Sequence, residues 1–322
     1  MNKALVAGFF LTAFSLACGG TSNLATPLPA PVISTDNFLP TPFQPVTSTA
    51  SSVPSETATA TLSATPFVTD TALPTVSLTP VPAWSWQGPG DVVVPILLYH
   101  HIEDTTSISP YYIAPAEFQQ QMNLLHRWGY QTISVQLLVD AITQGTLLPP
   151  KPIILTFDDG FASISGTAVP ILQQYGFTGT AYIVLNYIGL TGYMTAEQIQ
   201  ALAAAGWEIG SHSVSHVDLT VRSDRQRDEI LDSRQKLQAK LGVTILSFAY
   251  PFGAYDSDSV HYAHEARYLA AVGLGNESLQ SARNLFYLSR ISITPDLTLE
   301  AFASRLPWQG DLSAITLPTP TP

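Results

Sequence analysis

The stretch Val92-Val93-Val94-Pro95-Ile96-Leu97-Leu98-Tyr99 decides the fold class, because every residue in it is apolar. An unbroken apolar run of this length is typical of a strand that is buried on both faces, as in a parallel sheet. Similar short runs follow it, residues 152–157 among them, and helical patterns separate them. About seven such units without an internal repeat predict an α/β fold built as a parallel (β/α) barrel, with an open doubly wound sheet as the second choice.

Two helix signals stand out between these runs. Thr195-Ala196-Glu197-Gln198 is typical of a capping box that opens a helix. Residues 223–241 predict one long charged helix that ends at Gly242. Both helices follow predicted strands, as a barrel requires.

Charged residues are scarce and unevenly distributed. They make up 11% of the chain, against about 25% in an ordinary soluble domain, and no Lys or Arg occurs between Lys3 and Arg127. The net charge of -11 argues against a nucleic-acid partner, which would need a basic patch to neutralise phosphates. The single cysteine, Cys18, excludes an intramolecular disulfide framework and a zinc site built from cysteines.

The first part of the chain has the composition of an export signal and a tether. Residues 1–17 predict a signal peptide, since Lys3 precedes an apolar run that is too short to span a bilayer. Cys18 follows directly, in a setting that resembles a bacterial lipoprotein signal, and we expect it to carry a lipid anchor. Ser15 departs from that signal, so secretion with an unmodified thiol is the alternative.

The domain boundaries follow from composition. Residues 18–90 are rich in Thr, Ser and Pro and predict a disordered linker, and residues 311–322 predict a Thr/Pro tail. Residues 91–310 are left for one barrel-sized domain. We expect an extracellular monomer at the cell surface, held to the membrane only through the N-terminal lipid.

Two motifs with metal-ligand chemistry follow predicted strands. Asp158, Asp159 and Gly160 end the run of residues 152–157, and His212 and His216 follow the short strand predicted at residues 207–210. The carboxyl ends of parallel strands meet at one edge, where barrels place their catalytic groups. Each motif alone also fits an ordinary turn. Together, one carboxylate and two imidazoles give a three-ligand set with open positions, which is the catalytic zinc pattern.

A third motif follows the strand predicted at residues 245–250. It reads Tyr250-Pro251-Phe252-Gly253. Its residues are consistent with an aromatic wall beside the metal, and equally with a strand end followed by a turn.

In this order, the three motifs resemble those of the polysaccharide deacetylase family, the NodB-homology enzymes of carbohydrate esterase family 4. The resemblance covers residues 96–293. It implies a distorted, incomplete (β/α) barrel that hydrolyses N-acetyl or O-acetyl groups on sugars. The opening Pro95-Ile96-Leu97-Leu98-Tyr99-His100-His101 resembles the branch that acts on exported poly-N-acetylglucosamine.

The resemblance also implies roles for individual residues. Asp159, His212 and His216 would bind a divalent metal, for which Zn²⁺ is the first choice and Co²⁺, Mn²⁺ or Ni²⁺ are alternatives. Asp158 would be the general base. The motif of Tyr250, Pro251 and Phe252 would contact the substrate.

Two departures from the family pattern bear on the mechanism. The arginine that orients the base in many members is replaced by Ala249, and Phe252 stands where they carry tyrosine. No histidine follows His264, although common members carry a late Leu-x-His that supplies the general acid; Leu288-Ser289-Arg290 stands near that place. We therefore assign a proton-donating or second-sphere role to His100, or to its neighbour His101.

The sequence thus predicts a metal-dependent hydrolase that removes acetyl groups from an extracellular N-acetylglucosamine polysaccharide or peptidoglycan. The alternative is a catalytically weak glycan-binding lipoprotein, which the two departures motivate. A metal-dependent phosphoesterase would suit the same ligand set, but the chain lacks the basic residues expected around a phosphate.

Overall fold

The computed structural model describes residues 83–106 and 108–312, all of which lie in one compact unit of the chain. Its main sheet has the strand order β12-β11-β10-β9-β8-β3-β14, and every neighbouring pair in this order is parallel. The short strand β6 (Gln131–Thr132) also pairs with β8. In chain order the main strands are β3 (Ile96–Tyr99), β8 (Pro152–Phe157), β9 (Thr180–Ile183), β10 (Glu208–Ser211), β11 (Ser247–Ala249), β12 (Ala270–Val272) and β14 (Ile291–Ser292).

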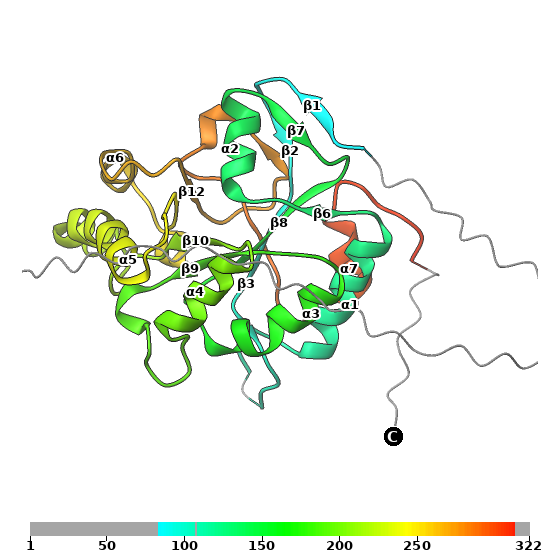
Figure 1. Cartoon of the computed structure of the whole chain (residues 1–322), viewed down its shortest axis with the longest axis horizontal. Coiled ribbons are helices and arrows are strands. Elements are labelled where there is room, and N and C mark those ends of the chain that lie inside the picture. The colour runs from blue at the N-terminus through cyan, green and yellow to red at the C-terminus, as the bar shows by residue number, and fades with distance from the viewer. Residues whose placement is uncertain (1–82, 107, 313–322) are drawn as a thin grey trace, which may run out of the picture. The chain divides into compact units, whose positions relative to one another are not determined.

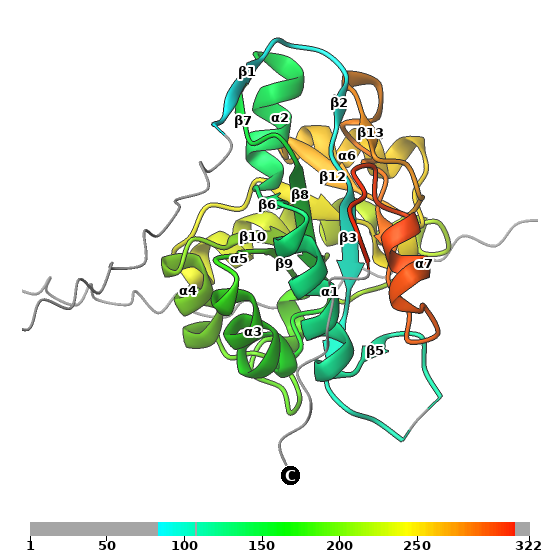
Figure 2. The same ribbon diagram turned by 90° about the vertical axis from the view of Figure 1, so that its right-hand side faces the viewer.

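The sheet curls into an incomplete barrel. Its two end strands, β12 and β14, are not paired as neighbours, and isolated bridges between Val272 and Leu288 and between Gly275 and Ile291 cross the gap. Helices lie around the outside of the curled sheet (Figures 1 and 2). The distorted (β/α) barrel is therefore confirmed, and the open doubly wound sheet is not observed in the described part of the chain.

The helices begin and end largely where the sequence indicates. Thr195 and Gln198 form a reciprocal capping box at the start of α4, and Gly242 closes α5 in the left-handed conformation, with φ of 67°. The helices are α1 (Pro115–Arg127), α2 (Val135–Thr143), α3 (Val169–Gln174), α4 (Ala196–Ala204), α5 (Ser233–Leu241), α6 (Ser257–Glu265) and α7 (Leu299–Ser304).

The predicted long helix over residues 223–241 is helical throughout, but its first half is not a regular α-helix. A 3-10 turn at Ser223–Arg225 and a π-helical segment at Asp228–Asp232 precede α5. The loop after β10 explains this difference, because its backbone N–H groups need an acceptor. The π-helical segment brings the carboxylate of Glu229 to these N–H groups. Such π turns are frequent at functional sites.

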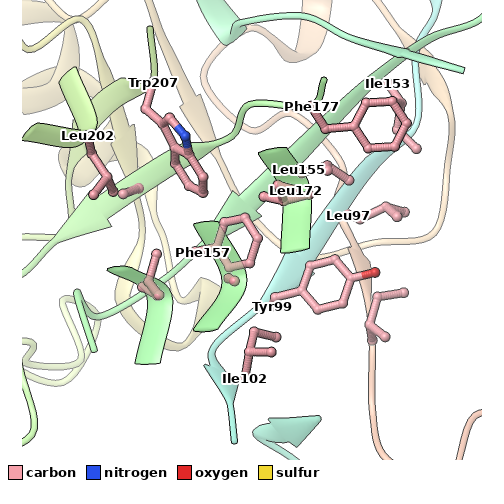
Figure 3. Close-up of a cluster of buried hydrophobic side chains, with 14 of the residues drawn as sticks. Leu97, Tyr99, Ile102, Ile153, Leu155, Phe157, Leu172, Phe177, Leu202 and Trp207 are labelled. Atoms are coloured by element: carbon pink, nitrogen blue, oxygen red, sulfur yellow. The ribbon is translucent and has the colours of Figure 1, made fainter. Parts of the chain in front are cut away.

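The buried side chains of β8 alternate between the two faces of the sheet. Ile153, Leu155 and Phe157 belong to one hydrophobic cluster, whereas Ile154 belongs to another. Figure 3 shows Phe157 in the first cluster beside Tyr99 of β3, and the two rings stack with centroids 5.5 Å apart. Because Phe157 points into this cluster, Thr156 and Asp158 face the opposite side, where the site lies.

Three two-stranded pairs complete the fold. They are β1 (Ser85–Gln87) with β7 (Thr146–Leu148), β2 (Val92–Val93) with β13 (Leu279–Gln280), and β4 (His101–Ile102) with β5 (Tyr112–Ile113). The β1 strand lies in the stretch that we expected to be linker, so the domain starts before residue 91. The predicted signal peptide, most of the linker, Cys18 and most of the tail lie outside the described residues. None of the described helices combines the length and apolarity that a bilayer span requires.

Candidate active site

Three side chains with metal-ligating atoms converge at the carboxyl edge of the sheet. Asp159 Oδ1 lies 3.5 Å from His212 Nε2 and 3.2 Å from His216 Nε2. One ligand atom from each residue can be chosen so that all three lie within 4.8 Å of one another. The structure therefore brings together the three residues to which the sequence assigned the metal.

Left-handed backbone at two turns makes this convergence possible. Asp159 and Gly160 have φ of 70° and 81°, so the chain turns sharply after β8 and both adjacent carboxylates enter the same site. Ser213 and His216 have φ of 68° and 57° in the loop after β10, and Ser213 Oγ accepts a hydrogen bond of 2.9 Å from the N–H of His216. Such conformations in residues other than glycine are uncommon and concentrate at functional sites.

The donor set fits a divalent metal. The buried Oδ1 atom of Asp159 has no hydrogen-bond partner among the described residues. His212 Nδ1 lies 2.8 Å from the carbonyl oxygen of Ala249, which fixes its proton there and leaves the Nε2 lone pair facing Asp159. An unpaired carboxylate oxygen beside two imidazole nitrogens is the arrangement that a cation would satisfy.

The pKa values of these groups agree with that reading. Burial lowers the pKa of His212 to about 3 and also lowers that of His216, so both rings are neutral and able to ligate at neutral pH. Burial and the nearby charge of Asp158 raise the pKa of Asp159 to about 7. A bound cation would favour the ionised form of Asp159 and remove this penalty.

Asp158 has a different partner, which the sequence analysis did not identify. Arg290 Nη1 and Nη2 donate to Oδ1 and Oδ2 of Asp158 at 2.7 and 2.9 Å, a bidentate ion pair in which both side chains are buried. Arg290 Nε donates to the carbonyl oxygen of Gly273 at 2.9 Å, and Nη1 also reaches Thr156 Oγ1 at 3.2 Å. Arg290 therefore supplies the orienting arginine that Ala249 cannot supply.

This pairing keeps Asp158 ionised. Burial alone would raise the pKa of Asp158, but the charge of Arg290, assisted by His212, outweighs burial and holds this pKa at about 2. Asp158 Oδ2 lies 3.6 Å from His212 Nε2, so the carboxylate faces the metal ligands. A charged, oriented carboxylate beside a metal set is suited to accept a proton from water.

His100 and His101 have different surroundings. His100 lines the same cavity as Asp158, with its ring centroid 4.7 Å from that of Tyr111, and burial lowers its pKa to about 4. His101 is stacked between the rings of Tyr112 and Phe161 and pairs with Glu103 at 3.1 Å. His101 is thus held in a stack, and His100 is the better placed of the two to meet a substrate.

The third motif is split between the cavity and the core. Phe252, with φ of 59° and 58% of its surface exposed, places its ring 4.6 Å from that of His216. Tyr250 is buried but contributes to the cavity wall, and its hydroxyl has no partner among the described residues. Pro251 is buried and is not among the residues that line the cavity, so its predicted substrate contact is not seen.

The cavity that holds these groups has a volume of about 890 Å³. Aromatic side chains from several loops share its wall with the five predicted metal-site and acid–base residues. The aromatic members are Tyr111, Tyr112, Phe161, Tyr193, Tyr250 and Phe252. Among the described residues that line it, Arg290 is the only Lys or Arg, and its guanidinium is already paired with Asp158, which argues against a phosphate substrate.

Comparisons with known proteins point to one family. The model of the family described as polysaccharide deacetylase matches residues 147–271. A Bacillus subtilis (strain 168) protein that bears the name of a polysaccharide deacetylase, YxkH, is 27% identical over 66% of this chain and 75% of its own. The poly-beta-1,6-N-acetyl-D-glucosamine N-deacetylase of Staphylococcus epidermidis is 22% identical over 49% of this chain and 60% of its own.

A solved structure of similar fold comes from Streptococcus pyogenes. The deacetylase PplD, in complex with acetate, superposes with a TM-score of 0.62 and 28% identity over 67% of this chain and 98% of its own. The motif order, the barrel, the converging site and these likenesses lead to one conclusion: the chain is similar to polysaccharide deacetylases, and these matches support a deacetylase enzyme.

Proposed function

We propose that the protein is a metal-dependent hydrolase that removes acetyl groups from an extracellular polysaccharide containing N-acetylglucosamine. One observation carries the proposal: the Asp158–Arg290 ion pair shares a cavity with the converging atoms of Asp159, His212 and His216. The name of the Staphylococcus epidermidis relative supports an N-acetylglucosamine polymer as the substrate. The acetate bound to the Streptococcus pyogenes structure supports acetate as the released product.

Asp159, His212 and His216 would hold the metal, with Zn²⁺ as the expected ion. A divalent ion in this set supplies Lewis acidity, which activates water and polarises a carbonyl oxygen. The protein's own contribution begins with Asp158, whose low pKa keeps it ionised and ready to accept a proton from the attacking water. Arg290 fixes both carboxylate oxygens, so that Asp158 can approach in one orientation only.

The leaving amine needs a proton, and we assign its delivery to His100, which lines the same cavity. Its ring is neutral at neutral pH because burial lowers its pKa to about 4. Negative charge that develops on the substrate during attack would raise this pKa, so that His100 would take up a proton from solvent water and pass it to the departing amine. The aromatic residues of the wall, Phe252 and Tyr193 among them, would stack on the apolar faces of sugar rings.

Acetate release tests the proposal directly. The purified protein, stripped with a chelator and reloaded with Zn²⁺ or Co²⁺, is incubated with β-1,6-linked N-acetylglucosamine oligomers, chitin oligomers, peptidoglycan and acetylated xylan. We expect metal-dependent acetate release that is highest on one of the N-acetylglucosamine polymers. Retention of glycan without acetate release would favour the glycan-binding alternative. That alternative was motivated by a missing arginine and a missing late histidine, and Arg290 now stands beside Asp158 in place of the first.

We also propose that the enzyme acts outside the cell and that Cys18 carries its lipid. The support is the signal-like sequence and the polymeric nature of the substrate. Labelling of the whole chain with a radioactive fatty acid, compared with a Cys18→Ser variant, tests this. Equal labelling of the two chains would exclude the anchor.

A further inference from the structure

The loop that joins the two histidine ligands rests on one buried carboxylate. Glu229 lies in the π-helical segment Asp228–Asp232, and its side chain is only 1% exposed. Its Oε2 atom accepts hydrogen bonds from the backbone N–H groups of Val214 and Ser215, at 2.9 and 2.8 Å. These are two of the three residues that separate His212 from His216.

The other oxygen of Glu229 is also fully engaged. Oε1 accepts a hydrogen bond of 2.6 Å from Ser215 Oγ, and it forms an ion pair with Arg225 Nη2 at 2.6 Å. The side chain of Arg225 is 40% exposed, so the buried charge of Glu229 is neutralised from the solvent side. Backbone amides, a hydroxyl and a guanidinium therefore satisfy the carboxylate from three directions.

The loop needs such support because its backbone is strained at both ends. Ser213 and His216 have positive φ, and the Ser213 hydroxyl is occupied by the N–H of His216. The N–H groups between them would have no protein acceptor in the described structure if Glu229 were absent. A conformation of this kind persists only where neighbouring groups hold it.

We propose that Glu229 is a positioning residue that preforms the metal site by holding the loop between His212 and His216. The inference rests on the proposed metal-dependent function. Glu229 is not a member of the candidate ligand set, and its contacts are with the loop backbone, Ser215 and Arg225, so it would act through the backbone that carries His216. Partners that hold metal ligands from outside typically contribute 10-fold to 100-fold in metal affinity.

Metal affinity of the full-length protein tests the inference. The metal-free wild type and the variants Glu229→Ala and Glu229→Gln are titrated with Zn²⁺ against a competing chelator, and with Co²⁺ for its visible absorption spectrum. We expect the dissociation constant for Zn²⁺ to rise about 10-fold to 100-fold in Glu229→Ala. Glu229→Gln should fall between this variant and the wild type, because its amide oxygen can still accept from the two backbone N–H groups.

Activity then separates positioning from catalysis. At saturating metal, the kcat of Glu229→Gln should lie within a few-fold of the wild-type value. If Glu229 took part in the reaction itself, kcat would stay low even at saturating metal. The matched control is Glu265→Gln, which removes an exposed carboxylate that pairs with Arg227 at 3.1 Å and should leave metal affinity within about 2-fold.

Each outcome has a distinct meaning. A dissociation constant within about 2-fold of the wild type in both Glu229 variants would overturn the inference, whereas a wild type that binds no metal would overturn the proposed function instead. If Glu229→Ala does not fold, Ser215→Ala removes one of the four hydrogen-bonding contacts and should weaken metal binding by a smaller factor. Unchanged affinity in both Ser215→Ala and Glu229→Gln would likewise overturn the inference.

Discussion

Asp158 and Asp159 are neighbours in the sequence, yet their pKa values shift in opposite directions. Asp158 lies on the side of the site that holds Arg290, and Asp159 lies on the side that holds His212 and His216. On one side, Arg290 gives Asp158 two charged hydrogen bonds and holds its pKa at about 2. On the other side, Asp159 has a buried oxygen that no described residue hydrogen-bonds, and its pKa rises to about 7. Burial raises the pKa of both carboxylates, so the difference between them comes from the arginine partner of Asp158, whose charge outweighs burial on that side only. The protein completes the Asp158 side by itself and leaves the Asp159 side for a cation.

The largest expected effect comes from neutralising each carboxylate in turn. Asp158→Asn should lower the rate of acetate release by about 10²-fold to 10⁴-fold, the usual contribution of a general base, while metal binding is retained. Asp159→Asn should instead lose metal affinity, as should His212→Ala. Acetate release and metal titration on the same preparations check this, and equal loss of metal in Asp158→Asn and Asp159→Asn would remove the distinction between the two sides.

Removing the arginine should break the Asp158 side alone. Arg290→Leu leaves a buried carboxylate unpaired, so the free energy of unfolding should fall by about 3 to 5 kcal/mol. Urea unfolding at neutral pH measures it, with Arg222→Leu as the control, because Arg222 forms a solvent-exposed pair with Asp224 that should contribute little to stability. A loss below about 1 kcal/mol in Arg290→Leu would show that the pair does not stabilise the fold.

The two carboxylates should also give opposite pH dependences of stability. Between pH 3.8 and about 7, folded metal-free protein holds a proton on Asp159 that the unfolded chain has released, so stability falls as pH rises through this window. Asp158 has its pKa lowered from 3.8 to about 2, so its contribution is present above pH 3.8 and is lost as pH falls toward 2.

Chelator-treated protein, unfolded by urea from pH 4 to 8, tests the Asp159 side. The fall attributable to Asp159 should reach about 1.4 kcal/mol per pH unit at most, and it should vanish in Asp159→Asn or with saturating Zn²⁺. A wild type whose pH profile overlays that of Asp159→Asn would contradict the raised pKa.

The smallest effect is expected at His100. His100→Ala should lower kcat by about 10-fold, below the usual range for acid–base catalysis, because the ring is neutral in the resting site. Metal content, measured by atomic absorption, should not change. His261→Ala is the control, since His261 is exposed on α6, and turnover in His100→Ala equal to that of this control would exclude the role of His100.

The sequence was sufficient to predict the barrel and the Asp159 side of the site. Polar residues directly after apolar runs, such as Asp159 after residues 152–157 and His212 after the strand before it, must meet at one sheet edge if the strands are parallel. The structure places them there, and Gly160 provides the expected turn.

The Asp158 side could not be predicted in the same way. Arg290 lies 132 residues from Asp158, and the pairing depends on β14 lying beside β3, a strand order that periodicity does not reveal. The available signal was an arginine within the apolar stretch around Leu288 and Ile291, because a buried arginine requires an acidic partner. Glu229 was missed for a related reason. It lies among the charged residues of the helix predicted over residues 223–241, and such a pattern is typical of a helix surface that faces solvent.

The position of Arg290 in the chain has a consequence for how the enzyme is made. Asp159, His212 and His216 all precede Arg290, so the residues of the possible metal set are synthesised before the arginine that pairs with Asp158. Only when the last strand, β14, docks beside β3 does Asp158 gain its partner. A chain cut short before β14 would therefore carry the residues of the ligand set but not the arginine that pairs with Asp158.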